Sequence, residues 1–304
     1  MTKKQINGIG SGMKFGFELE VKNSNSTARN AIAAAMQAAG ITNFRRHDGY
    51  SHSNGREWDL KLDGSAGSEL ASPILIGQAG LDEAKKVTDI LHATLETLEG
   101  HVDHVDSRCG MHVHVDVNHL TPAQLGTFLR LWHKFESTIF SLVPTSRRTN
   151  SYCQMVRRYM RNEDDFAVFA NGWSRLSNPT DRVRRWTSTF GRYTSINLDH
   201  YNSRGTIEFR LFGGTTDASK VIGNILLCLR LVQCAVEMKK VSWKSKATKT
   251  SALEMMLYGI NLYGKVTLDD NAITCRNFIR ARWAKFNMPT RNAGRNRMDV
   301  EREA

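Results

Sequence analysis

Residues 107–118 read S-R-C-G-M-H-V-H-V-D-V-N, and this stretch decides the fold that we expect. Apolar side chains alternate here with polar ones, which are His112, His114 and Asp116. Successive side chains of a β-strand point to opposite faces of the sheet. The stretch therefore predicts a strand with one apolar face and one face of groups that can bind metal ions.

The same alternation occurs twice more along the chain. Near the start, Glu18 and Glu20 alternate with apolar residues in K-F-G-F-E-L-E-V, residues 14–21. Much later, Glu208 and Arg210 alternate with apolar residues in T-I-E-F-R-L, residues 206–211. A half-buried sheet usually carries Thr, Ser or Lys on its polar face. Three strands with charged pairs therefore suggest one sheet face that carries a metal site.

The remaining elements follow from hydrophobic periodicity and from helix stop signals. We expect further strands at 58–63, near 69–74 and at 192–199, and helices at 28–39, 80–99, 121–142, 217–239, 251–263 and 268–284. Segment 45–57 predicts a polar loop, and 147–192 predicts short helices around a long loop. The expected fold class is α+β, with a curved, largely antiparallel sheet whose convex side carries the helices 80–99, 121–142 and 217–239.

Composition shifts divide the chain into three parts. Residues 1–13 predict a flexible lead-in, and residues 14–241 predict the main globular domain. Residues 242–304 predict a basic linker at 242–249, a helical extension and a poorly ordered polar tail at 288–304.

The overall composition is typical of a globular protein, for which we expect a cytoplasmic location. The 304 residues are 40% hydrophobic and 24% charged, and we see no apolar run near the ~18 residues that a membrane span needs. Residues 1–13 lack the apolar core of a signal peptide. Five scattered cysteines without C-x-x-C spacing predict free thiols. The net charge of +12 fits a nucleic acid, an anionic surface or a polyanionic substrate equally well.

Several carboxylates are candidate metal ligands. Glu18 and Glu20 form an E-x-E pair, and magnesium prefers such oxygen ligands. Asp63 and Glu69 flank the turn D-G-S-A-G-S, so two adjoining strands can supply two more carboxylates. Both pairs also have an ordinary explanation, as a solvated strand face and as simple turn chemistry.

The two histidines leave three interpretations open. In the first, His112 and His114 have ordinary hydrogen-bond partners on a half-exposed strand. In the second, one histidine binds magnesium or manganese and the other contacts a phosphate. In the third, the two form a zinc-binding H-x-H pair. The accompanying carboxylates favour the harder ions. Glu208 and Arg210 form either an ion pair or a metal ligand beside a guanidinium that suits phosphate.

Together these segments predict a site for a nucleoside triphosphate, where metal ions and an arginine neutralise phosphate charge. The sequence contains no Walker A loop, kinase signature or G-x-G-x-x-G motif. Metal ions and side chains would therefore hold the phosphates, in place of a glycine-rich loop.

Five sequence blocks resemble the "putative amidoligase" family of bacteria, fungi and phages. The blocks are F-G-F-E-L-E (15–20), W-D-L-K-L-D-G-S (58–65), G-S-E-L-A-S-P (67–73), C-G-M-H-V-H-V-D (109–116) and S-I-N-L with T-I-E-F-R-L-F-G-G-T (195–198 and 206–215). The block G-M-H-V-H also resembles a strand of glutamine synthetases. The order of the E-x-E and T-I-E-F-R segments is similar to that of the glutamine synthetase and glutamate–cysteine ligase superfamily. The resemblance covers residues 14–240.

This resemblance implies a glutamine synthetase-like sheet and an ATP-dependent carboxylate–amine ligase. Such an enzyme forms an amide, isopeptide-like bond through an acyl phosphate at a two-metal site. ATP and Mg²⁺ or Mn²⁺ would be its cofactors, and a small-molecule or peptide carboxylate and an amine its substrates.

The resemblance also implies residue roles. One ion would bind Glu20, Asp63 and Glu69, and the other would bind Glu18, His112 and Glu208. Catalysis would involve Arg210, which stabilises the transferring phosphoryl group, with Glu208 and Asp63. Contacts to ATP, or to a substrate carboxylate, would come from His114, Asn197, Arg184, Arg185 and Arg192.

Two other functions stay open at this point. A metal-dependent hydrolase would use the H-x-H pair to activate water. A non-catalytic nucleic-acid-binding protein would use the net charge and the interleaved arginines and aromatic residues of 147–192. That basic segment also fits a substrate pocket or a solvated surface. Nucleic acid is the less favoured partner, no membrane partner is expected, and the sequence does not predict the oligomeric state.

Overall fold

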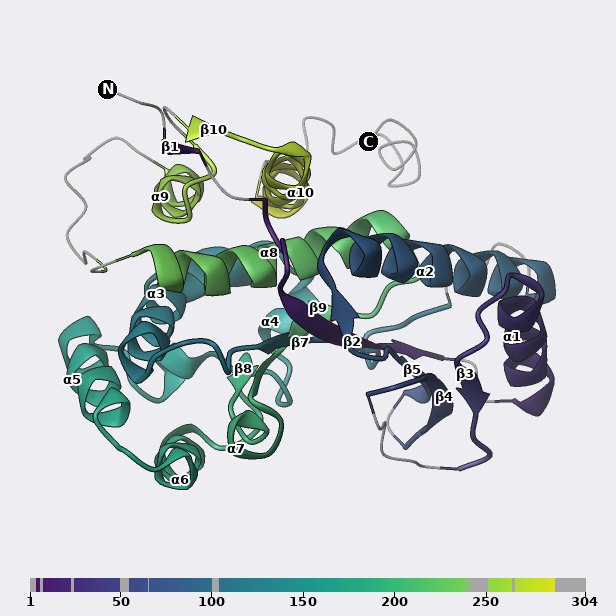
Figure 1. The fold of residues 1–304 in the computed structure, drawn as a ribbon, viewed down its shortest axis with the longest axis horizontal. Helices are drawn as coiled ribbons and strands as arrows, with labels where there is room; N and C mark the ends of the chain where they lie inside the picture. Colours follow the sequence, from purple (N-terminus) through teal and green to yellow (C-terminus); the bar gives the residue numbers. More distant parts are fainter. Residues whose placement is uncertain are drawn as a thin grey trace.

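The computed structural model describes residues 4–5, 8–22, 25–49, 55–64, 66–99, 104–238, 241, 251–263 and 266–287. Within these ranges the chain is α+β, built on an open, mixed eight-stranded sheet (Figure 1). The order along the sheet is β3-β4-β5-β2-β7-β9-β8, and β6 pairs with the start of β2. A separate two-stranded sheet joins β1 to β10.

The strands occupy the following residues: β1 Lys4–Gln5, β2 Lys14–Val21, β3 Phe44–Arg46, β4 Trp58–Asp63, β5 Gly67–Ala71, β6 Leu75–Ile76, β7 Gly110–Asp116, β8 Ile196–Asn197, β9 Thr206–Gly213 and β10 Val266–Thr267. The pair β3–β4 is parallel, and the other neighbours in the large sheet are antiparallel. The expectation of a largely antiparallel sheet is therefore confirmed, whereas its curved, glutamine synthetase-like form stays a prediction.

The helices are α1 Ser26–Ala38, α2 Gly77–Glu99, α3 Pro122–Phe140, α4 Thr145–Arg148, the 3₁₀ turn η1 Val156–Arg158, α5 Glu163–Ser174, α6 Pro179–Phe190, α7 Tyr201–Arg204, α8 Ala218–Glu237, α9 Ala252–Gly259 and α10 Asp270–Asn287. Their ends follow local chemistry. Thr121 caps α3 in a capping box with Gln124. Gly40 follows α1 at φ +77°, a conformation that favours glycine.

The apolar face of the sheet packs against α3 and α8. Phe209 of β9 contacts Phe128 and Trp132 of α3 edge-on, at ring-centroid distances of 5.8 and 5.3 Å. Asn224 of α8 donates to the sulfur of Met111 on β7. Figure 1 shows α8 and α2 across this side of the sheet, with α5, α6 and α7 beyond the β8 edge. The charged side chains of β2, β7 and β9 therefore face away from the α3–α8 layer.

Helix α8 is long and rich in buried apolar residues. By length and composition it could cross a membrane, whereas we expected no apolar run of that length from the sequence. However, 72% of its most apolar 18-residue window is buried in the fold. Buried Arg230 interrupts it and is paired with Glu237 at 3.0 Å. We therefore interpret α8 as a core helix. All five cysteines are free and buried, which confirms the thiol prediction.

Three local predictions differ from the structure. Segment 45–57 was expected to be a loop, but residues 44–46 form β3 against β4 because Trp58 pairs with Phe44. The connection between β8 and β9, where the sequence predicts a turn at Asp199–Ser203, contains the short helix α7. The basic segment 147–192 contains the expected short helices, but they leave no single long loop between them, because Asn162 and Asn178 cap α5 and α6.

The C-terminal helices pack on the outer side of α8. The Phe278 ring of α10 lies over Gly223 of α8, where a Cβ would approach its Cγ atom to 2.3 Å. Arg282 donates to the Leu142 carbonyl at 3.0 Å. Strand β1 of the expected lead-in pairs with β10 of the extension. The expected linker 242–249 and tail 288–304 lie outside the described residues.

Candidate active site

Strand register brings the charged pairs of β2, β5 and β7 together. Glu18 lies opposite His112, and Glu20 lies opposite Glu69. Residues that are directly opposite in a sheet share a face and have neighbouring side chains. Strands β2, β5 and β7 therefore share one charged face, as the sequence predicts for β2 and β7.

Strand β9 adds to the same face. His114 lies opposite Glu208, which in turn lies opposite Asn197 of β8. The β7–β9 register shifts by one residue between Met111 and Val113, which marks a β-bulge. Beyond this bulge Phe212 is buried, so the simple alternation of β9 does not continue.

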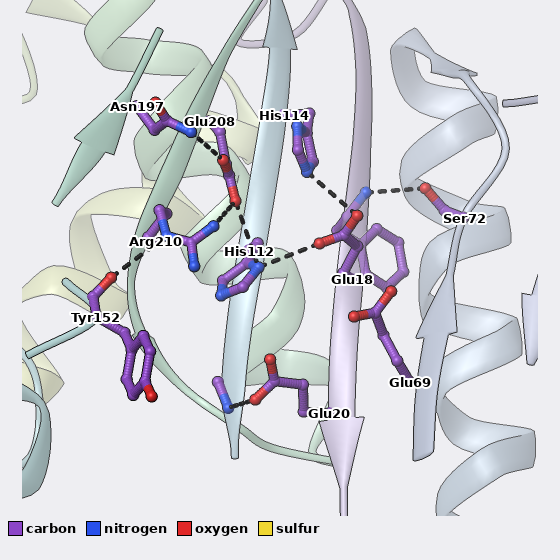
Figure 2. Close-up of polar contacts among 12 residues, drawn as sticks. Glu18, Glu20, Glu69, Ser72, His112, His114, Tyr152, Asn197, Glu208 and Arg210 are labelled. Carbon is purple, nitrogen blue, oxygen red and sulfur yellow. Dashed lines mark hydrogen bonds and ion pairs between the residues drawn. The ribbon is translucent and has the colours of Figure 1, made fainter. Parts of the chain in front are cut away.

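A first cluster forms around Glu18 (Figure 2). One oxygen of Glu18 is 3.1 Å from Nδ1 of His112, and the other is 3.5 Å from Nε2 of His114. Nδ1 of His112 is also 3.4 Å from Oε1 of Glu208. One ligand atom each from Glu18, His114 and Glu208 lie within 4.8 Å of one another. Three strands thus converge on one candidate ion site.

A second cluster forms between β2, β4 and β5. One carboxylate oxygen each of Glu20, Asp63 and Glu69 lie within 4.8 Å of one another. Lys61 pairs with Glu69 at 2.9 Å. The structure thus brings the predicted set Glu20, Asp63 and Glu69 together, across the turn that joins β4 to β5. In the first cluster it groups His114 with Glu18 and Glu208, where the prediction named His112.

The backbone and a neighbouring turn hold two of these carboxylates in place. The N–H of Gly110 donates to Oε2 of Glu20 at 2.5 Å. The N–H of Ala66 donates to Oδ1 of Asp63 at 2.8 Å. Each contact engages one carboxylate oxygen and thereby restricts the orientation of the group.

The charge state of the first cluster follows from its neighbours. Burial opposes ionisation of Glu18, but the adjacent His114 and His112 together hold its pKa well below the usual value. The pKa values of both histidines are raised although burial acts against this, mainly through Glu18 and Glu208. Burial also works against ionised Glu208, whose pKa is nevertheless lowered by both histidines and Arg210.

Glu69 is in a different position. Burial and the negative charge of Glu18 raise the pKa of Glu69 to about 7, although Lys61 acts in the opposite direction. The fold thus holds acidic side chains close together where little water reaches them. A bound cation relieves such repulsion, and carboxylate oxygens are hard donors that suit Mg²⁺ or Mn²⁺. The donor set of both clusters therefore fits divalent ions.

Arg210 lies at the edge of the first cluster. Its guanidinium forms an ion pair with Oε1 of Glu208, and its Nε donates to the Tyr152 carbonyl at 3.3 Å. Asn197 donates to the other oxygen of Glu208 at 2.9 Å. Both oxygens of Glu208 are therefore engaged, and Arg210 is oriented toward the charged face.

Arg147 is a site residue that sequence analysis did not single out. It is buried, and its Nη2 donates to the Arg210 carbonyl at 2.8 Å. A Cβ on Gly110 would lie 3.3 Å from this Nη2 and 3.3 Å from Oε2 of Glu20. Nothing in the sequence distinguishes Arg147 from its arginine neighbours, because its place depends on α4 packing against β9.

A cavity of about 510 Å³ opens beside the first cluster. Glu18, His114 and Asp116 are among its lining residues, and Lys14 and Arg204 add positive charge to its wall. Ile74 and Pro73 supply an apolar side. The cavity therefore combines cations, an apolar surface and access to a candidate metal site.

The three arginines expected to contact ATP lie elsewhere. Arg184 is exposed and pairs with Asp181 at 3.3 Å. Arg185 lies over the Phe169 ring and Arg192 over the Tyr193 ring. In the part of the chain that the structure describes, none of them lines the cavity or pairs with the clusters. Their role in phosphate binding stays a prediction.

Comparison with known proteins finds a family match. A family described as "putative amidoligase enzyme" matches residues 11–232, which include both clusters, the cavity and Arg210. No curated protein matches the chain. Because the match spans well over half of the 304 residues, the chain belongs to this amidoligase family.

Proposed function

We propose that the protein is an ATP-dependent carboxylate–amine ligase. The observation that carries the proposal is the convergence of two candidate ion sites on one sheet face beside Arg210. Phosphoryl transfer needs positioning and charge neutralisation more than it needs covalent chemistry by the protein. A face with two ion sites and a guanidinium supplies both.

The proposed reaction has two steps. An oxygen of the substrate carboxylate attacks the γ-phosphorus of ATP, the bond from that phosphorus to the β–γ bridging oxygen breaks, and ADP leaves. The nitrogen of the amine then attacks the carbonyl carbon of the acyl phosphate and loses a proton. Phosphate departs with the carbon–oxygen bonding pair, and the amide remains.

The residues have separable roles in this proposal. Glu20, Asp63 and Glu69 hold one divalent ion, and Glu18, Glu208 and a histidine of β7 hold the other. Both histidines are close enough to serve, since His112 pairs with Glu18 and Glu208, and His114 with Glu18. Bound Mg²⁺ would neutralise phosphate charge. Arg210 contacts the phosphoryl group as its charge reorganises.

The cavity is our candidate for the nucleotide. Its volume of about 510 Å³ is in the range of small-molecule sites. Lys14 and Arg204 complement the charge of a polyphosphate, while Ile74 and Pro73 offer an apolar surface to a base. This assignment gives phosphate contacts to Arg204 and Lys14, in addition to the predicted Arg184, Arg185 and Arg192.

A product assay tests the proposal. ATP with Mg²⁺ is incubated with the protein and a panel of acids and amines, and release of ADP and phosphate is measured. We expect phosphate release that requires both an acid and an amine. Turnover of amides without ATP would contradict ligation and indicate a hydrolase. The family match does not favour that alternative or a non-catalytic nucleic-acid-binding role.

A further inference from the structure

Two histidines and a glutamate meet outside the candidate active site. His92 and Glu96 are one turn apart on α2, so their side chains lie on the same side of the helix. His104 lies in the segment that leads into β7, and its carbonyl accepts from the Lys22 N–H at 3.0 Å. One ligand atom from each of the three residues lie within 4.8 Å of one another.

The contacts within this group fit a shared ion. Nε2 of His104 is 3.2 Å from Oε1 of Glu96. Two ligands that bind one tetrahedral ion at about 2.0–2.1 Å are separated by about 3.3 Å. The two atoms are therefore already at the spacing of neighbouring ligands. His104 is buried, whereas His92 is exposed, so an ion here has a route from solvent.

Thr216 orients the third ligand. Nδ1 of His92 is 2.9 Å from the hydroxyl oxygen of Thr216, in the segment before α8. A metal-bound histidine commonly uses its other ring nitrogen for such a hydrogen bond, which fixes the ring. This contact leaves Nε2 of His92 for the ion.

We propose that His92, Glu96 and His104 bind one Zn²⁺-type ion. Two imidazoles and one carboxylate are a donor set for borderline ions such as Zn²⁺, whereas Mg²⁺ prefers sites in which carboxylate oxygens predominate. The ion would have a structural role, because it joins α2 to the segment just before Gly110. The N–H of Gly110 holds Glu20, so the ion would also steady one wall of the active site.

Zinc titration of the chelator-treated protein tests the proposal. Excess Mg²⁺ is present to compete at the carboxylate-rich clusters. We expect one Zn²⁺ per chain, with affinity about 100-fold lower in His92→Ala and Glu96→Gln, since each loses a ligand. Thr216→Val keeps the shape and should bind about 10-fold more weakly. His119→Ala removes an exposed histidine elsewhere and is the matched control.

A second background separates this site from the active site. Glu18→Gln alters the first cluster, and we expect this variant to keep one equivalent of Zn²⁺. The double variant Glu18→Gln with His92→Ala should lose it. Co²⁺ in place of Zn²⁺ should give the visible absorption of a four-coordinate ion in the Glu18→Gln variant. Wild-type Zn²⁺ affinity in both His92→Ala and Glu96→Gln would overturn the proposal and leave a hydrogen-bonded His104–Glu96 pair. These outcomes do not depend on ATP turnover, so the failure of the ligase proposal would be recognised separately.

Discussion

The buried carboxylate of Glu136 on α3 accepts a 2.5 Å hydrogen bond from the hydroxyl of Ser195, one residue before β8. The carbonyl of Ser195 accepts from the N–H of Arg210 at 2.8 Å. The same carboxylate also accepts from the N–H groups of Val156 and Arg157 and from Nε1 of Trp132. One buried side chain therefore connects α3 and η1 to the edge of the candidate active site.

Glu136→Ala should destabilise the fold on the order of 3 kcal/mol or more. The substitution leaves several buried donors without an acceptor, and each such group costs about 1–3 kcal/mol. Chemical denaturation measures the free energy of unfolding. Asp165→Ala, which removes an exposed carboxylate of α5, should change it by about 0.5 kcal/mol or less. Similar values for both variants would show that the Glu136 contacts carry little energy.

The sequence predicted the charged sheet face because period-two alternation is local. The E-x-E, H-x-H and E-x-R pairs each read directly as one face of a strand. The pairing of β4 with β5 also followed, since a short turn joins the two strands. These features depend on residues that are close in sequence.

The residues that were missed depend on distant packing. Arg147 reaches the Arg210 carbonyl only because α4 packs on β9. Glu136 reads as one more polar residue of a helix, and its four donors come from three separate segments. The bulge in the β7–β9 pair shifts register without a glycine or proline to mark it. Local patterns carry no information on such contacts.

The free energy of unfolding should decrease as the pH falls from about 6.5 to about 4, because of His133. Its ring is buried, stacks on Phe166 at 4.1 Å, and Nε2 donates to the Met160 carbonyl. Burial lowers the pKa of His133 to about 4, which outweighs the opposing effect of that hydrogen bond. In this window the unfolded chain binds a proton that the folded chain does not. The difference reaches about 3 kcal/mol at its low end.

Denaturation curves from pH 4 to pH 8 test this prediction. His133→Gln keeps a hydrogen-bond donor and cannot titrate, so its free energy of unfolding should fall less steeply below pH 6.5 than that of the wild type. His119→Gln replaces an exposed histidine and should follow the wild type. Parallel curves for wild type and His133→Gln would mean that His133 binds its proton equally in both states.

Mg²⁺ with ATP should raise the melting temperature of the wild type and not that of Glu20→Gln. A ligand present at 100 times its Kd stabilises by about 2.7 kcal/mol, which corresponds to about 5 °C for a chain of this size. The amide of Gln keeps the shape of Glu20 but loses its charge. Asp82→Asn on the outer surface of α2 should keep the full increase. An equal increase in Glu20→Gln would contradict the assignment of Glu20 to an ion.

Arg210→Lys should lower kcat on the order of 100-fold or more, with a much smaller change in KM for ATP. Lysine keeps the positive charge but loses the planar fork, which in Arg210 contacts Glu208 and the Tyr152 carbonyl together. Arginine stabilisation of phosphoryl transfer acts mainly in the transition state, where it contributes about 10³-fold or more. An interaction made only there changes kcat and leaves ground-state binding nearly intact.

Loss of the Arg210 fork also removes one of the contacts that hold Oε1 of Glu208, so metal affinity has to be measured in the same variant. Titration with Mn²⁺ should give the wild-type value, because Asn197 still holds the other oxygen of Glu208. Asn197→Ala then provides the matched comparison, since it removes that second contact and should weaken Mn²⁺ binding more than Arg210→Lys does. If Arg210→Lys turns over at the wild-type rate and only its KM for ATP rises, Arg210 binds the ground state and takes no part in transfer.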